Sequence, residues 1–382
     1  MLSFSLIVLL LICVLFMGLP VAFSLGGTSL VLIAAFELPM KIVGATIFSS
    51  LDSFTVLSIP LFVLMSQILL DGRIGDDLFD VMNAWVRHLP GGLAIATILA
   101  CAFFAAITGS GAATAATIGM VAYPAMIERG YEKKFTLGLL AAGGTLGILI
   151  PPSIPMILYG SITEESVGKL FIAGVIPGLV LTGLFIAYAV YKSKRGGFTP
   201  MEKAPWSERL QVTRKNFWGI LLPFLIIGGI YTGAFTPTEA AAVGLVYSLF
   251  ITLVVYRTIR LRDIPDICLR SVTTSCMIAV IIAGAVLFGR VMTLLMIPQK
   301  LTELVISNNF SVMMFLIAMN VLMIILGCIL ETVSIVLLTM PLVTPILHAL
   351  GIDPIWYGIV VTVNMTLALI TPPVGMNLYI IN

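Results

Sequence analysis

Groups that could bind an ion or a carboxylate occur at two matched places in a chain that is otherwise strongly apolar. Residues 145–153 read TLGILIPPS and residues 366–374 read TLALITPPV, at one offset of 221 residues (372 minus 151). A helix cannot run unbroken through adjacent prolines, because each removes a backbone donor and blocks the preceding turn. We therefore predict helix breaks at Pro151, Pro152, Pro372 and Pro373. Helix ends exposed at such breaks can hold a carboxylate at amide groups and Na⁺ at carbonyl groups.

Two further stretches place oxygen donors between apolar segments. Residues 108–114 read TGSGAAT, where glycine permits a tight turn and carbonyls with the Ser110 hydroxyl suit an alkali cation. Alternatively, these small residues only allow close helix packing, as Gly143 and Gly147 would. At the same offset of 221, residues 330–335 read LETVSI. Glu331 would then lie inside the membrane as a candidate functional group, unless it reaches water near a loop.

The composition identifies the class of protein. Of the 382 residues, 60% are hydrophobic and 10% are charged, whereas a soluble domain has about 25% charged residues. Apolar runs of about 20 residues indicate helices that span a bilayer, so we expect an all-α polytopic membrane protein. The net charge of +2 gives no basis for nucleic-acid binding. Five dispersed cysteines and two histidines indicate neither a transition-metal site nor an enzyme motif.

The first half of the chain divides into two parts. Residues 1–91 are predicted to contain spans at 2–17, 20–36 and 53–70, an interfacial piece at 38–50, and an amphipathic arm from Asp71 to His88. Residues 92–190 are predicted to contain a hairpin at 92–127, a broken helix at 134–158 and a span at 168–190. A hairpin is favoured because a single helix over 92–127 would be about 54 Å long, and the hydrocarbon core is only ~30 Å thick.

A hydrophilic linker at 191–217 separates this half from a second one of similar plan. Residues 218–308 are predicted to contain spans at 218–234, 238–256 and 272–294 and an interfacial piece at 297–308, and residues 311–382 a hairpin at 311–346 and a broken helix from 354. Matching glycine and proline residues recur at a constant offset within each part of the two halves, and we use them as landmarks. Examples are Pro20 with Pro237, Gly72-Arg73 with Gly289-Arg290, and Gly130 with Gly351. The offset changes from 217 to 221 (237 minus 20, 351 minus 130), so we predict an internal repeat with four extra residues in the second half.

The distribution of basic residues predicts the orientation. If the linker is cytoplasmic, 16 of the 20 Lys and Arg residues fall on its side, as the positive-inside rule requires. Five predicted crossings precede the linker when the hairpin returns to its own side, so the repeats would be inverted and Met1 would be periplasmic. A counterpart of the span 168–190 would fall near 389–411, so we expect the sequence as given to lack a final helix.

Five stretches together resemble a known family. They are IPLFVL at 59–64, TGSGAAT at 108–114, GILIPPS at 147–153, LE at 330–331 and LITPPVGMNL at 369–378. They resemble the large membrane subunit (DctM-like) of tripartite ATP-independent periplasmic (TRAP) transporters, over essentially the whole chain. The resemblance implies an inverted-repeat, elevator-type transporter of the ion transporter superfamily kind. Two re-entrant helical hairpins and two broken helices would move against a scaffold.

The resemblance also implies a function and its residues. The function would be Na⁺-coupled import of a carboxylate-bearing solute, such as a sialic acid or a C4-dicarboxylate, across the bacterial inner membrane without a cofactor. The partners would be a small four-helix membrane subunit (Q type) and a periplasmic solute-binding protein (P type). Matched by motif, the Na⁺ sites would use Ser110, Gly111, Gly147, Glu331, Thr332, Thr371 and Gly375. The solute would contact Thr114, Ser153, Thr371 and Asn377.

Other interpretations fit parts of the pattern. A Na⁺- or H⁺-coupled anion carrier could work without a binding protein, and copurification of a small membrane subunit would decide against it. A non-transporting assembly subunit of a membrane complex would have no need for paired helix breaks. For Arg73 and Arg290, snorkelling to the interface is the preferred interpretation. Asn320 and Asn364 could bind the solute or bond across helices.

Overall fold

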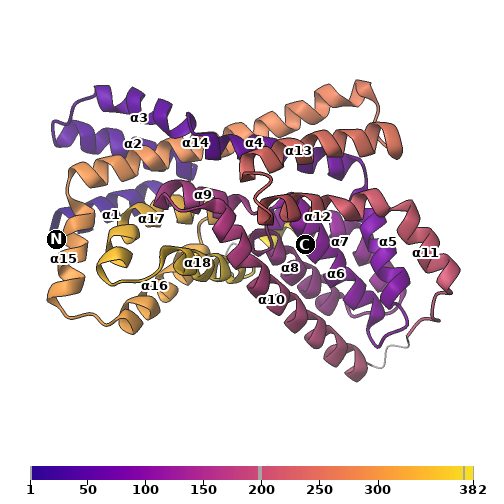
Figure 1. Ribbon diagram of the computed structural model, residues 1–382. Coiled ribbons are helices and arrows are strands. Elements are labelled where there is room, and N and C mark those ends of the chain that lie inside the picture. The colour runs from indigo at the N-terminus through magenta and orange to yellow at the C-terminus, as the bar shows by residue number, and fades with distance from the viewer. Residues whose placement is uncertain (1, 197–199, 373–374, 382) are drawn as a thin grey trace.

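A computed structural model describes residues 2–196, 200–372 and 375–381, which form α-helices joined by short connections (Figure 1). The helices before the linker are α1 (Leu2–Phe16), α2 (Val21–Ala35), α3 (Lys41–Leu51), α4 (Phe54–Asp71), α5 (Ile74–Val86), α6 (Gly92–Thr108), α7 (Gly111–Glu128), α8 (Lys133–Leu149), α9 (Ile154–Thr163) and α10 (Val167–Arg195). After it come α11 (Trp206–Lys215), α12 (Phe217–Tyr231), α13 (Pro237–Phe250), α14 (Ile264–Leu294), α15 (Ile297–Ser307), α16 (Val312–Gly327), α17 (Thr332–Ala349), α18 (Pro354–Ala368) and α19 (Met376–Ile381). A π-helical turn (Ile251–Val255) continues α13, and a 3-10 turn (Leu261–Asp263) precedes α14.

Several of these helices are suited to a bilayer. Within the described residues, six helical segments are long and apolar enough to cross a membrane: Phe54–Asp71, Lys133–Thr163, Val167–Arg195, Pro237–Val255, Leu261–Leu294 and Thr332–Ala349. Shorter apolar helices, such as α6 and α12, lie between them in the sequence. The prediction of an all-α, multiply spanning membrane protein is confirmed at this level.

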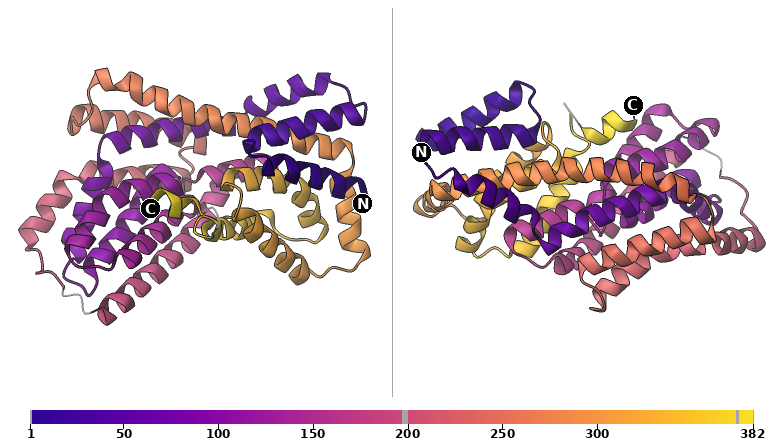
Figure 2. Two further views of the ribbon diagram at one scale, coloured as in Figure 1. Left: turned by 180° about the vertical axis from the view of Figure 1, so that it is seen from behind. Right: turned by 90° about the horizontal axis from the view of Figure 1, so that it is seen from above.

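Two long helices form a common wall for the rest of the molecule. Figures 1 and 2 show α14 running along one side with α4 beside it, and the two helices pack against each other. Below them lie two helical groups, one built from α6, α7 and α8 and the other from α16, α17 and α18 (Figure 1). Residues on α4 and α14 therefore face groups that come from both halves of the sequence.

Some predicted boundaries are shifted in the structure. The helix α14 begins at Ile264 rather than at residue 272, and α10 continues to Arg195, inside the range assigned to the linker. The linker also contains α11. Because these segments contain polar residues, the hydrophobic pattern predicts shorter spans. The helices nevertheless continue beyond the apolar part of the sequence.

The landmark pairs Gly72-Arg73 and Gly289-Arg290 are not structurally equivalent. Arg73 lies in the left-handed region (φ 57°) between α4 and α5, whereas Gly289 and Arg290 lie inside α14. The corresponding turn between α14 and α15 is made by Met296, with φ 58°. The shared dipeptide predicts equivalent positions, but its backbone conformation depends on where the surrounding helix ends.

The basic segments predicted to share one side of the membrane meet at one end of the molecule. Arg87 Nη1 lies 2.7 Å from Glu208 Oε1, and Trp85 Nε1 donates to Thr213 Oγ1 at 2.9 Å. Arg270 donates to the Asp71 carboxylate. These contacts join the α5 arm and the start of α14 to the α4 end and to α11, and we call this the linker end.

Candidate functional site

The turn between α6 and α7 is built by its small residues. Gly109 has φ 62°, which glycine adopts without strain, and it ends α6. Ser110 is extended (φ −132°) and caps α7 by accepting from Ala113 N at 3.4 Å. Thr114 Oγ1 donates to Ser110 O at 2.8 Å and lies 3.1 Å from Thr108 Oγ1. The hydroxyls of Thr108 and Thr114 therefore stabilise the turn from within.

The first helix break contacts this turn directly. Pro151 and Pro152 lie buried between α8 and α9. Ser153 is fully buried and its hydroxyl donates to Ile148 O, a carbonyl that the break leaves without a helical partner. Ile154 N, the first amide of α9, donates to Gly109 O at 3.4 Å. This hydrogen bond satisfies a backbone amide of the break and a backbone carbonyl of the turn.

Gly147 marks the closest approach between α8 and the turn. A Cβ at this position would lie 2.4 Å from Ser110 O and 2.8 Å from Gly111 N. Real Cβ atoms do not approach other heavy atoms so closely, so only glycine fits here. The last turn of α8 therefore packs directly against the backbone of the Ser110-Gly111 turn, and an added Cβ at Gly111 would lie 3.1 Å from Gly144 O.

The second half contains a similar arrangement. Glu331 caps α17 in an extended conformation, and its side chain makes no capping hydrogen bond. At the second break, Thr371 Oγ1 donates to Leu367 O at 2.6 Å, and Gly375 has φ 49°. Pro372 is exposed, and Pro373 lies outside the described residues.

Asn377 connects the two broken helices. Its backbone N donates to Leu369 O at 3.1 Å, and its Nδ2 donates to Ala141 O on α8 at 3.1 Å. The side chain is fully buried, and its Oδ1 has no hydrogen-bond partner among the described residues. A buried amide oxygen without a donor is costly, so this atom is suited to accept a cation or a proton donor.

One cavity of about 310 Å³ joins the turns, the breaks and the common wall. Its lining comes from four places: α4 with Val63, Ser66 and Gln67; the first turn and break with Thr108, Gly109, Ser110, Gly111, Ala112, Ala113, Ile148, Ile154 and Pro155; α14 with Thr274, Met277 and Ile278; and the second turn and break with Glu331, Thr332, Val333, Leu369 and Met376. Ser66 Oγ donates to Thr108 O at 3.2 Å, which holds α4 against the first turn. We call this the main cavity.

Helix ends of both polarities reach the main cavity. The first residues of α7, α9 and α17 line it, so amide groups that lack a helical partner are close by. Thr108, the last residue of α6, and Ile148, in the last turn of α8, line it as well. Helix N-termini favour an anion and C-termini favour a cation. The arrangement can therefore hold a carboxylate and an alkali cation near each other.

A much smaller cavity lies beside the second turn. It measures about 20 Å³ and is lined by Gly327, Leu330, Glu331, Thr332, Ala368, Leu369, Gly375 and Met376. A volume near 10–15 Å³ is enough for one water-sized particle. The Glu331 residue lines both this cavity and the main cavity.

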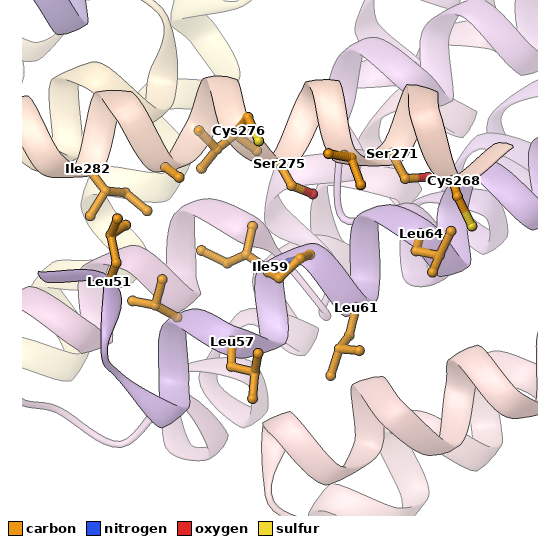
Figure 3. Close-up of a pocket in the computed structure, with 15 residues that line it drawn as sticks. Leu51, Leu57, Ile59, Leu61, Leu64, Cys268, Ser271, Ser275, Cys276 and Ile282 are labelled. Atoms are coloured by element: carbon orange, nitrogen blue, oxygen red, sulfur yellow. The ribbon is translucent and has the colours of Figure 1, made fainter. Parts of the chain in front are cut away.

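A third cavity, of about 490 Å³, has a different character. Figure 3 shows Ile59 and Leu64 of α4 on the side toward α14, which contributes Cys268, Cys276 and Ile282. Its wall is largely apolar, and the hydroxyl of Ser271 donates to Ile267 O within its own helix. Such a wall offers little to an ion or a carboxylate, so we place the candidate site in the main cavity.

The structure separates the predicted site residues into two sets. Ser110, Gly111, Glu331 and Thr332 line the main cavity, and Gly375 lines the small one. The remaining predicted residues lie in neither lining: Thr114, Gly147, Ser153, Thr371 and Asn377.

Sequence reasoning missed the contribution of the common wall. Gln67 on α4 and Thr274 on α14 line the main cavity. Thr274 Oγ1 donates to Arg270 O at 3.1 Å, whereas no hydrogen bond of the Gln67 amide to a described residue exists. A lone amide in the middle of an apolar span was the available signal, since such a group needs a partner in hydrocarbon.

Comparison with known proteins gives consistent matches. Residues 8–382 match the family model "Tripartite ATP-independent periplasmic transporter, DctM component". The chain is 47% identical over 335 residues to the C4-dicarboxylate TRAP transporter large permease protein DctM of Pseudomonas aeruginosa, covering 87% of this chain and 78% of that protein. It is 35% identical over 371 residues to the sialic acid TRAP transporter large permease protein SiaM of Vibrio cholerae, covering 96% and 86%. It is 37% identical over 366 residues to the isethionate TRAP transporter permease protein DctMQ of Oleidesulfovibrio alaskensis, covering 95% and 58%.

Proposed function

Because the chain belongs to the DctM component family of the tripartite ATP-independent periplasmic transporters, we propose that it carries a C4-dicarboxylate or a related organic acid through the inner membrane by Na⁺-coupled symport. The family resemblance inferred from the five sequence stretches is confirmed, and the chain is a transport protein rather than an enzyme. The relative with 47% identity is named for C4-dicarboxylates, and the one with 35% identity for sialic acid. This order of similarity favours the C4-dicarboxylate.

The observation that carries the proposal is the main cavity. Both turns and both breaks contribute to its lining, although they come from residues near 110, 150, 331 and 372 in the sequence. The N-termini of α7 and α17 supply amide groups for the solute carboxylate, and Gln67 supplies an amide from the opposite wall. One face of the solute would thus be bound by the turns and the other by α4 and α14.

We place one Na⁺ between the end of α8 and the Ser110-Gly111 turn. An added Cβ at Gly111 would lie 3.1 Å from Gly144 O of α8 and 3.6 Å from Asn377 Oδ1. That amide oxygen has no hydrogen-bond partner among the described residues. Carbonyl and amide oxygens are the donors that hard cations prefer. This arrangement fits the residues Ser110, Gly111 and Gly147 that the family resemblance suggested.

A second Na⁺ would occupy the small cavity at Glu331. The lining contains the carboxylate-bearing Glu331, the Thr332 hydroxyl and the backbone of Gly375. The backbone carbonyl of Thr371 would be a further ligand, because an added Cβ at Gly375 would be 3.3 Å from Thr371 O. A cation here would offset the charge of an acidic side chain in a largely apolar environment.

An elevator movement is the mechanism that this geometry supports best. The turns and breaks form one side of the main cavity, while α4 and α14 form the other. Movement of the first group along the second would carry the bound solute across the membrane, whereas the common wall would stay in place. With the linker end cytoplasmic, the main cavity would lie in the cytoplasmic half of the span, because its α14 residues, Thr274, Met277 and Ile278, lie between the Arg270 end and the middle of that helix.

Partner proteins follow from the family. We propose that a small membrane subunit and a periplasmic solute-binding protein assemble with the chain. The DctMQ relative is longer, and this chain covers 58% of it. The extra part of that relative is suited to supply the small subunit within one polypeptide.

The test is uptake by reconstituted vesicles. The chain, its small subunit and the solute-binding protein are used with labelled succinate, under an inward Na⁺ gradient or an inward K⁺ gradient of equal size. We expect uptake with Na⁺ and none above background with K⁺. Equal uptake in both conditions would refute Na⁺ coupling, and Na⁺-driven uptake without the binding protein would favour the simpler anion carrier.

A further inference from the structure

A second polar cavity, of about 700 Å³, lies at the other end of α14 from the linker end. It is bordered by α3, α9, α14 and α17, with lining residues Ala45, Thr46, Ser49, Ser50, Ser53, Val56, Leu158, Ser161, Ile162, Ile282, Val286, Gly289, Arg290, Thr293, Leu337 and Pro341. Its volume lies within the range of small-molecule sites, roughly 300–1,000 Å³. We call it the α3 cavity.

The charge of the α3 cavity is carried by Arg290. This side chain is exposed, and it has neither an ion pair nor a hydrogen bond with any residue that the structure describes. Among the described residues, no acidic side chain belongs to the cavity lining. A guanidinium presents five donors in a planar fork that matches a carboxylate. In a wall otherwise made of hydroxyl-bearing and apolar residues, it is therefore a donor group without an acceptor.

Hydroxyl groups surround this cation. Within the part of the chain that the structure describes, Thr46, Ser53 and Ser161 line the cavity with hydroxyls that have no hydrogen-bond partner. Ser49 and Ser50 donate to carbonyls of their own helix at 3.1 and 2.8 Å. The first three hydroxyls are free to donate to an anion, and all five oxygens favour a hydrated, polar interior.

The α3 cavity lies in line with the main cavity. Four helices contribute residues to both linings: α4, α9, α14 and α17. On α14 the lining shifts from Ile278 in the main cavity to Arg290 in the α3 cavity, and 12 residues (290 minus 278) correspond to about 18 Å of helix. A solute that moved along α14 away from the linker end would therefore meet Arg290.

We propose that the α3 cavity is an anion-binding vestibule, in which Arg290 binds the carboxylate of the organic acid on its way between the face opposite the linker end and the main cavity. This inference rests on the proposed function for the identity of the solute. Charged side chains within membrane spans commonly mark substrate pathways. Snorkelling, the preferred interpretation from sequence, would leave Arg290 without a specific acceptor.

The first test measures binding without transport. A variant with Ser50→Cys and the five native cysteines replaced is labelled with a fluorescent maleimide in detergent, with or without succinate. We expect succinate to slow labelling, the neutral analogue succinamide to have no effect, and Arg290→Gln to abolish the protection. Lys300→Gln on α15 is the matched control, because it removes an exposed cation outside the lining, and protection should remain. If the maleimide labels this cysteine at the same rate with and without succinate, the vestibule proposal is wrong.

The second test uses uptake and separates recognition from snorkelling. In reconstituted vesicles, Arg290→Gln should raise the apparent KM for succinate-loaded binding protein by about tenfold, the scale of one charge-assisted hydrogen bond, with the Na⁺ dependence unchanged. Arg290→Lys keeps the charge and the ability to snorkel but loses the fork, so we expect a several-fold rise. An unchanged KM in both variants would overturn the vestibule and leave the proposed function intact. Wild-type vesicles that take up no succinate under a Na⁺ gradient would instead refute the proposed function, and the labelling result would then decide the vestibule alone.

Discussion

Replacing Gly147 with alanine is the most direct test of the proposed Na⁺ site at the first turn. The added Cβ would lie 2.4 Å from Ser110 O, 2.6 Å from Ser110 C and 2.8 Å from Gly111 N. All three atoms are backbone, so no side chain can rotate to make room. Restoring an ordinary contact of about 3.4 Å requires α8 and the turn to separate by about 1 Å. Oxygen donors from the two elements could then no longer contact one ion together.

The expected energies follow from this geometry. Overpacking costs about 1–3 kcal/mol, and the better helix propensity of alanine offsets about 1 kcal/mol. We therefore expect Gly147→Ala to lose at most about 2 kcal/mol of stability and to remain folded. A displacement of about 1 Å at a binding site can reduce activity by about 100-fold. Uptake should fall by about that factor, and the Na⁺ concentration for half-maximal uptake should rise.

The assay is Na⁺-driven succinate uptake together with thermal unfolding of the detergent-solubilised protein. The matched control is Gly138→Ala on the same helix, where an added Cβ would meet nothing within 4 Å. That variant should show unchanged uptake. If Gly147→Ala transports with the Na⁺ dependence of the wild type, the proposed ion site at the end of α8 is wrong. A loss of folding in Gly147→Ala but not in Gly138→Ala would show that the cost of overpacking was underestimated.

Three further predictions concern contacts outside that site. Gln67→Leu should reduce succinate uptake by about tenfold with little change in melting temperature, because it removes an amide that faces the main cavity and bonds no described residue; unchanged uptake would remove Gln67 from solute binding. Asn364→Leu should lose about 1 kcal/mol in unfolding measurements, because Asn320 Oδ1 then loses its donor, and combining it with Asn320→Leu should recover part of that loss. Arg87→Ala breaks the ion pair with Glu208 (2.7 Å) and should lower stability by about 1 kcal/mol; the effect should shrink in 1 M salt, and an equal loss at high salt would contradict an electrostatic origin.

The turns and breaks could be predicted from the sequence because their causes are local. Adjacent prolines at 151 and 152 cannot continue a helix, and the structure ends α8 at Leu149. Gly109 takes a left-handed conformation that few other residues adopt. Ser110 then caps α7 through its own side chain. In each case the residue type determines the backbone within a few positions, so no knowledge of distant contacts was needed.

The walls opposite the turns could not be predicted in the same way. Gln67 and Arg290 line cavities because α4 and α14 pack against elements from both halves of the chain. The residues next to Gln67 and Arg290 in the sequence do not predict that packing. Arg290 was also compared with Arg73, a residue at a turn, although Arg290 lies inside a helix. A shared dipeptide is a weak landmark when the helix end that surrounds it differs.

The hydroxyls of Thr114, Ser153 and Thr371 stabilise the backbone around the main cavity and do not line it. Each of these hydroxyls donates to a backbone carbonyl of its own turn or break, and none of them lines the main cavity. Their loss would first alter the backbone geometry, which then presents amide and carbonyl groups to the cavity. Because helix ends supply backbone groups there beside side chains such as Gln67, Ser110 and Glu331, a substitution that shifts a helix end by about 1 Å should impair transport more than the removal of any one of these hydroxyls.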